Sequence, residues 1–132
     1  GRYLVVKRSP SERLLERYIP GATLRINWGG RRTESVSVDD EAGTITVRWN
    51  PASGFTTLLH EIGHYRLRHH GPAQLERELI APKASTILAE VAAWLWAERA
   101  ARRHRLTFDY DRANRAFRTY TRDVQIAWRH GP

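Results

Sequence analysis

The 132-residue sequence predicts a single α+β domain over residues 1–132. Three observations favour this class: a capped helix start near the N-terminus, alternating apolar and polar residues between positions 22 and 50, and helical periodicity over most of the remaining chain. The length suits one hydrophobic core rather than two. We therefore expect one helix, then a small sheet, then further helices that pack on it.

The first expected helix begins at Ser9, a residue type that suits the N-cap position. Pro10 fits the first helical position, and Glu12 can return a hydrogen bond to the cap. Apolar residues then recur on one face until Pro20-Gly21 ends the helix. Before it, residues 3–6 form a short apolar run that suits a strand or a docking arm.

Three segments alternate with a period of two, at residues 23–28, 34–38 and 44–49. The turn sequences Gly29-Gly30 and 39–43 separate them, so we expect a three-stranded antiparallel meander with one buried face. An edge strand of such a sheet can pair with an extended peptide. The position of the sheet directly before the following helix is therefore relevant to function.

That following helix contains His60-Glu61-Ile62-Gly63-His64, the pattern H-E-x-x-H. Residues four apart lie on one helix face, so both histidines can bind a single metal ion. With a third protein ligand and an open position for water, this is the arrangement of a catalytic zinc site. Glu61 is then placed to act as the general base. The alternative is a structural helix whose histidines only form hydrogen bonds.

The context of the motif favours the metal site. Leucines and isoleucine give the helix an apolar face, and Gly63 in a helix interior needs a reason such as close approach of another backbone. The helix is expected to end at residues 69–72, where Gly and Pro stop it. In an unbroken helix His70 lies about 15 Å from His60 along the axis. We therefore interpret His69 and His70 as solvated residues of the helix end.

A third ligand is expected further along the chain. Residues 82–86 suit a loop and cap, and residues 87–99 suit a helix that is apolar over most of its surface, with Glu90 as the exception. A carboxylate in such a position is costly unless it is paired or bound to an ion. Pairing with a surface arginine is the alternative, and Glu76 and Glu78 are weaker candidate ligands.

The motif and the downstream helix, with the segment Glu90-Val91-Ala92-Ala93-Trp94-Leu95-Trp96-Ala97, resemble the ImmA/IrrE family of zinc metallopeptidases. The resemblance covers about the middle third of the chain. It implies a zincin-like, gluzincin-like fold with His60, His64 and Glu90 as zinc ligands and Glu61 as general base. It also implies a protein substrate such as a DNA-bound transcriptional repressor. Trp94 departs from the family, which usually has Asp or Asn there, and this removes a polar group that could orient a ligand.

Catalysis also needs a donor for the oxyanion, and Tyr65, His104 and Tyr110 are the candidates. Beyond His104, aromatic and apolar residues recur at three or four positions between 110 and 128. This spacing predicts a last helix that packs an aromatic stripe on the core.

Composition excludes several classes of protein. The chain has no cysteine, which rules out disulfides and thiolate zinc sites, and it has no apolar run of membrane-spanning length and no signal pattern. These absences indicate a cytoplasmic protein that makes no contact with a membrane. The chain starts at Gly1 and has no methionine, which indicates a trimmed chain or a domain of a longer protein. The net charge of +8 suits a nucleic-acid partner only weakly, because the arginines are spread over every segment.

The function expected from these observations is zinc-dependent hydrolysis of peptide bonds in a protein substrate. Three alternatives remain: a SprT-like protease that acts on DNA-bound proteins, an excised toxin or effector protease domain, and a catalytically silent, basic module that binds DNA or protein.

Overall fold

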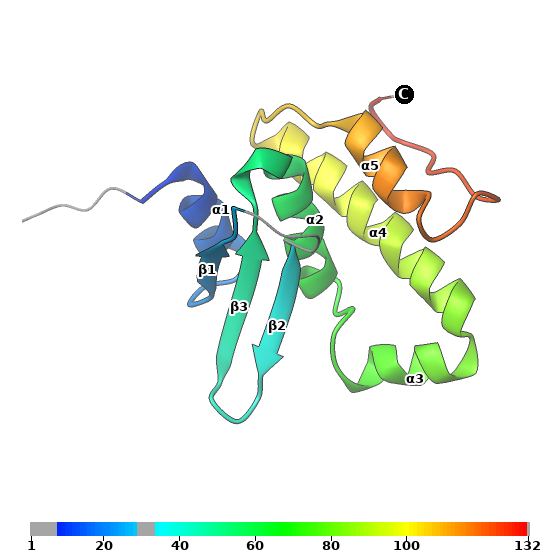
Figure 1. Ribbon diagram of the computed structural model, residues 1–132, viewed down its shortest axis with the longest axis horizontal. Helices are drawn as coiled ribbons and strands as arrows, with labels where there is room; N and C mark the ends of the chain where they lie inside the picture. Colours follow the sequence, from blue (N-terminus) through cyan, green and yellow to red (C-terminus); the bar gives the residue numbers. More distant parts are fainter. Residues whose placement is uncertain (1–7, 29–33, 132) are drawn as a thin grey trace, which may run out of the picture.

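The computed structural model describes residues 8–28 and 34–131. The elements of these residues are, in order, α1 (Pro10–Tyr18), β1 (Thr23–Ile26), β2 (Ser35–Asp39), β3 (Thr44–Trp49), the 3-10 turn η1 (Pro51–Ser53), α2 (Phe55–Arg66), α3 (Pro72–Ile80), α4 (Pro82–Arg103) and α5 (Tyr110–Phe117) (Figure 1). The α+β class is confirmed. The apolar run at residues 3–6 and the expected Gly29-Gly30 turn lie outside the described residues. Of the described helices, none combines the length and apolar character needed to cross a bilayer.

The capping box of α1 is confirmed. The Ser9 side chain accepts a hydrogen bond from the backbone N–H of Glu12, whose carboxylate accepts from the Ser9 backbone in return. The cap fixes the start of the helix, and Leu14 and Leu15 then bury its apolar face. The local sequence alone therefore determines where this helix begins.

The sheet is mixed, so the prediction of an antiparallel meander is wrong. Its strand order is β1-β3-β2. Val36 of β2 pairs with Val47 of β3 in the antiparallel direction, whereas Leu24 of β1 pairs with the same Val47 in the parallel direction. The central position is thus filled by the last strand of the three. Side-chain alternation reports which residues face the core but not which strands are neighbours, so it could not reveal this order.

Helix α2 lies between the sheet and the long helix α4, and it makes its most extensive contacts with α4 (Figure 1). Gly63 permits this packing: a Cβ atom at that position would lie 3.0 Å from the backbone oxygen of Ala93 and 3.1 Å from a ring carbon of Trp96. This explains a glycine in the helix interior. It also brings the histidine face of α2 to the turn of α4 that carries Glu90.

The hydrophobic core has three parts. The first joins α1 and α2 to the sheet, and its buried members are Leu15, Ile19, Val36, Val47, Trp49, Leu58 and Ile62. The second joins α1, α2 and α4 through Leu14, Leu59, Ala97, Ala100 and Ala101. The third joins α4 to α5 and the C-terminal segment through Trp94, Ala113, Phe117 and Ile126. Residues of α2 or α4 belong to each part. These two helices therefore share in the whole core, and the close packing between them gives the side chains at their contact a fixed geometry.

Three helix boundaries differ from the prediction. Helix α2 ends at Arg66, because Arg68 adopts a left-handed conformation with φ of 59° and turns the chain back. Gly71-Pro72 starts α3 rather than ending α2, with Pro72 at the first helical position. Residues 82–86 are the first turns of α4 rather than a loop.

The predicted aromatic helix up to residue 128 is also wrong, since α5 ends at Phe117 and the following residues to 131 contain no helix. Hydroxyl groups compete with helical hydrogen bonds there: Thr119 donates to the Ala116 carbonyl, and the Thr121 hydroxyl accepts from the backbone of Asp123. The end of the segment is held by Glu98 of α4, which accepts from the backbone of Arg129 and His130.

Candidate metal centre

His60 and His64 project from one face of α2, as their spacing predicts. Their rings lie with centroids 4.5 Å apart, and their Nε2 atoms are 3.0 Å from each other. His60 is buried and His64 is half-buried. Two imidazole nitrogens therefore meet at a single point just below the surface.

Glu90 reaches the same point from α4. Its Oε2 atom lies 2.7 Å from Nε2 of His60 and 3.3 Å from Nε2 of His64. Four ligands held about 2.0–2.1 Å from a zinc ion form a tetrahedron with edges of about 3.3 Å. One of the three separations, 3.3 Å, equals such an edge and the other two, 2.7 and 3.0 Å, are shorter, so the three atoms converge on one point. A donor set of two imidazoles and one carboxylate suits a divalent metal ion such as zinc. The residues present thus fit a metal ion, and they are the three that the sequence indicates.

The electrostatics of the cluster favour a cation. Burial alone raises the pKa of Glu90, but hydrogen bonds and charge interactions with His60 and His64 outweigh burial and hold its pKa well below the usual range. Three lone-pair-bearing atoms this close repel one another unless a proton or a metal ion lies among them. No described arginine forms an ion pair with Glu90, so the alternative pairing is not observed.

Trp94 supports His60 from the side. Its indole stacks on the imidazole with ring centroids 3.7 Å apart and planes 6° apart. Trp94 is buried between α2 and the α5 region, so it restricts the rotation of the His60 ring. Trp94, which stands where the ImmA/IrrE family usually has Asp or Asn, thus orients His60 by packing rather than by hydrogen bonding.

His69 is a second supporting residue, and its interpretation as a solvated helix-end residue is wrong. The turn at Arg68 folds the chain back so that Nδ1 of His69 lies 2.8 Å from Nδ1 of His64. Burial lowers the pKa of His69 to about 4, so the ring is neutral at pH 7. Its lone pair can then accept the Nδ1 proton of His64, which leaves Nε2 of His64 free to bind a metal. His70 remains exposed, with its ring centroid 6.5 Å from that of His64.

Glu61 lines a cavity of about 310 Å³ together with His64 and Glu90. Its Oε1 atom is 3.6 Å from Nδ1 of His60, and 15% of its side chain is exposed. Burial raises the pKa of Glu61, and the neighbouring histidines only partly offset this. A carboxylate with a raised pKa beside a possible metal-binding group is suited to accept a proton.

Strand β2 forms one wall of this cavity. Ser35 and Val36 line it from the sheet side, and Tyr120 lines it from the segment after α5. Since β2 is at the end of the strand order, it has β3 as its partner on one side among the described residues. The described sheet has two edge strands, β1 and β2, and β2 is the one that lines the cavity beside the cluster, which the sequence could not indicate.

The predicted oxyanion donors lie elsewhere. The Tyr65 side chain packs against the part of the core that joins α1 and α2 to the sheet. His104 Nε2 is 2.6 Å from the Tyr18 hydroxyl, and the Tyr110 hydroxyl donates to Glu98 at 2.7 Å. None of these three side chains lines the cavity.

The weaker candidate ligands also lie outside the cluster. Glu78 lines the cavity but accepts a hydrogen bond from Gln74, and Glu76 is exposed on α3. Neither belongs to the metal-binding group, whose members in the described part of the chain are His60, His64 and Glu90.

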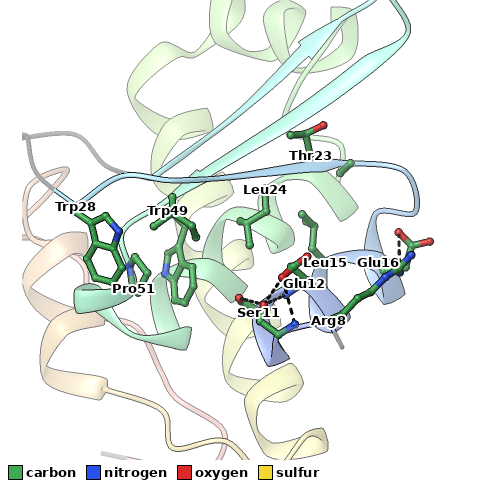
Figure 2. A pocket seen from close by; sticks show the side chains of 13 residues that line it. Arg8, Ser11, Glu12, Leu15, Glu16, Thr23, Leu24, Trp28, Trp49 and Pro51 are labelled. Atoms are coloured by element: carbon green, nitrogen blue, oxygen red, sulfur yellow. Dashed lines mark hydrogen bonds and ion pairs between the residues drawn. The ribbon is translucent and has the colours of Figure 1, made fainter. Parts of the chain in front are cut away.

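A larger cavity of about 830 Å³ lies at the β1 edge of the sheet, where residues of α1 and β1 line it (Figure 2). Its polar side chains interact with each other: Ser9 bonds to Glu12 in the cap, and Arg8 forms an ion pair with Glu16 at 3.8 Å. None of the candidate site residues lines it. The larger of these two cavities is therefore not the one beside the candidate metal-binding residues.

Comparison with protein-family models, with curated proteins and with solved structures found no match to this chain.

Proposed function

We propose that this chain is a zinc-dependent metallopeptidase with a zincin-like arrangement, in which His60, His64 and Glu90 hold the metal and Glu61 is the general base. The observation that carries the proposal is the convergence of three donor atoms from two helices, with separations of 2.7–3.3 Å, beside a half-buried glutamate. The resemblance of the motif and the Glu90 helix to the ImmA/IrrE family supports the same reading.

When bound there, zinc lowers the pKa of a coordinated water toward about 7 and polarises a carbonyl group. The protein supplies the remaining functions. Glu61 takes the proton of the attacking water and passes it to the leaving amine, which its raised pKa favours. Trp94 and His69 hold the two imidazoles in position. His70 and Tyr120 line the cavity, and each carries a group that can donate a hydrogen bond to the oxyanion.

The substrate backbone is expected to run along β2. An extended peptide can add to this strand by main-chain hydrogen bonds, and Ser35 and Val36 of β2 line the same cavity as Glu61. This would place a peptide carbonyl over the metal-binding group without any specific side-chain contact. A protein substrate with an accessible extended segment, such as a DNA-bound repressor, fits this requirement.

The test compares two matched variants. Glu61→Gln should lower cleavage of a degenerate peptide library by about 100-fold or more, while zinc content and thermal unfolding stay as in the wild type. Glu76→Gln, an exposed position on α3, should cleave normally. Equal activity of the Glu61→Gln variant would contradict the proposed mechanism.

The remaining alternatives give different results in the same experiments. Cleavage that DNA stimulates would favour a protease acting on DNA-bound proteins. A chain that binds no zinc but binds DNA with strong salt dependence would favour the silent module, and would contradict the proposal.

A further inference from the structure

A second hollow adjoins the metal-side cavity, and we call it the α3–α4 groove. It has a volume of about 430 Å³ and lies between the end of α2, helix α3 and the first half of α4. Its lining is Leu67, His69, Gln74, Arg77, Ile80, Ala81, Ala84, Ser85, Leu88 and Ala89. Most of these side chains are aliphatic, and the volume falls in the range of small-ligand pockets.

The groove is continuous with the candidate metal centre. His69, Gln74 and Ala89 line both hollows, and Ala89 directly precedes the ligand Glu90. A chain lying over the cluster would therefore place a neighbouring side chain at the mouth of the groove.

The polar side chains of the groove are already satisfied within the protein. The Gln74 carbonyl oxygen accepts from Nε and Nη2 of Arg77 at 3.1 and 2.8 Å, and its amide donates to Glu78. The Ser85 hydroxyl donates to the Pro82 carbonyl. An apolar side chain lying on the aliphatic wall would break none of these hydrogen bonds, whereas a cationic occupant would lose its hydration and meet Arg77.

The aliphatic walls are open to solvent. Leu88 is 69% exposed and Ile80 is 79% exposed, and both face the groove. Covering them with an apolar side chain would remove this surface from water, which is favourable. Exposed large apolar residues clustered beside a reactive centre indicate a binding surface rather than isolated surface residues.

We propose that the α3–α4 groove is a specificity subsite that takes a large aliphatic or aromatic side chain of the peptide substrate, at a position next to the bond that is cleaved. The proposal rests on the proposed peptidase function. It adds a substrate class: peptides with a leucine-like or phenylalanine-like residue at one fixed position beside the scissile bond.

The test fills the groove with a larger side chain, introduced at an exposed residue that lines it. Ala84→Phe places an aromatic ring in the groove, and Ala73→Phe adds the same ring at an exposed position of α3 that does not line it. With a degenerate peptide library, the wild type and Ala73→Phe should select a large apolar residue at one position beside the bond. Ala84→Phe should cleave such peptides about 10-fold less well, with unchanged zinc content. Cleavage by the wild type without this preference, or a preference that Ala84→Phe retains, would overturn the inference.

A second measurement separates failure of the subsite from failure of the peptidase. Metal-free protein is titrated with N-acetyl-leucinamide, and the amide resonances of Ser85 and Ala89 should shift in the wild type but not in the Ala84→Phe variant. If no peptide is cleaved although zinc binds, the peptidase proposal fails and this titration decides the groove alone. Absence of the shift at millimolar ligand would overturn the subsite. A wild-type dimer that Ala84→Phe dissociates in sedimentation would also overturn it, because the occupant would be a second copy of the chain.

Discussion

Helix α4 carries two buried carboxylates, Glu90 and Glu98, and they differ in what surrounds them. Glu98 accepts three hydrogen bonds, from the Tyr110 hydroxyl and the backbone N–H groups of Arg129 and His130, and so ties the C-terminal segment to the helix. Glu90 faces two imidazole nitrogens beside an open cavity. Burial is similar in the two cases, so the partners decide the role. A buried acid that protein donors satisfy is structural, and one that converges with other lone pairs is a candidate ligand.

The largest expected effect separates the two glutamates by metal binding. Glu90→Gln should weaken zinc binding by at least about 100-fold, since loss of a ligand costs more than loss of a supporting contact. Thermal unfolding of the metal-free variant should stay close to that of the metal-free wild type. Competition with a chelator measures the affinity. Unchanged zinc affinity would remove Glu90 from the metal site.

The opposite result is expected at the other glutamate. Glu98→Ala leaves the Tyr110 hydroxyl and two backbone N–H groups without their acceptor, so it should lower the free energy of unfolding by about 1–3 kcal/mol. Amide exchange should increase near Arg129 and His130, while zinc affinity should be unchanged. Chemical denaturation and hydrogen exchange measure these effects. A loss of zinc binding in this variant would break the distinction between the two acids.

A smaller effect tests the support of His64. His69→Leu removes the acceptor for the Nδ1 proton of His64 and should weaken zinc binding by about 10-fold. His69→Asn keeps an acceptor oxygen and should recover most of the affinity. Equal losses in both variants would show that His69 acts only through packing.

The smallest expected effect is a pH dependence of the stability that the hydrogen bond between Tyr110 and Glu98 contributes. Burial, together with the hydrogen bond to Glu98, raises the pKa of Tyr110 to about 12. Because the tyrosine pKa is raised in the folded state, its contribution to stability is complete below about pH 10 and is lost as the pH rises through 12. The wild type should therefore lose stability over this interval, and Tyr110→Phe should lose less. Identical slopes in the two proteins would contradict this assignment.

The sequence predicted the part of the site that local spacing determines. The helical period places His60 and His64 on one face, and a lone acid in an apolar helix marked Glu90, which the structure brings to both of them. Gly63 indicated the close approach of a second backbone, and the packing against Ala93 confirms it. These signals are local or depend on the cost of burying one group.

The features that the sequence did not predict depend on long-range pairing. Glu98 lies in the same helix as Glu90, but two of its three donors are about 30 residues away in a segment without regular structure, and the third is Tyr110 of α5. His69 reaches His64 only because Arg68 adopts a left-handed conformation. Few sequence patterns predict this conformation at a residue other than glycine. The parallel pairing of β1 with β3 leaves the same alternation as a meander. In each case the missing information is which distant segment becomes a neighbour.

The most direct test of the account is anomalous diffraction at the zinc edge from crystals grown with zinc. We expect one strong peak among Nε2 of His60, Nε2 of His64 and Oε2 of Glu90. Crystals with saturating zinc that show these three side chains converging as described, but with no anomalous peak between them, would contradict the assignment of a metal centre.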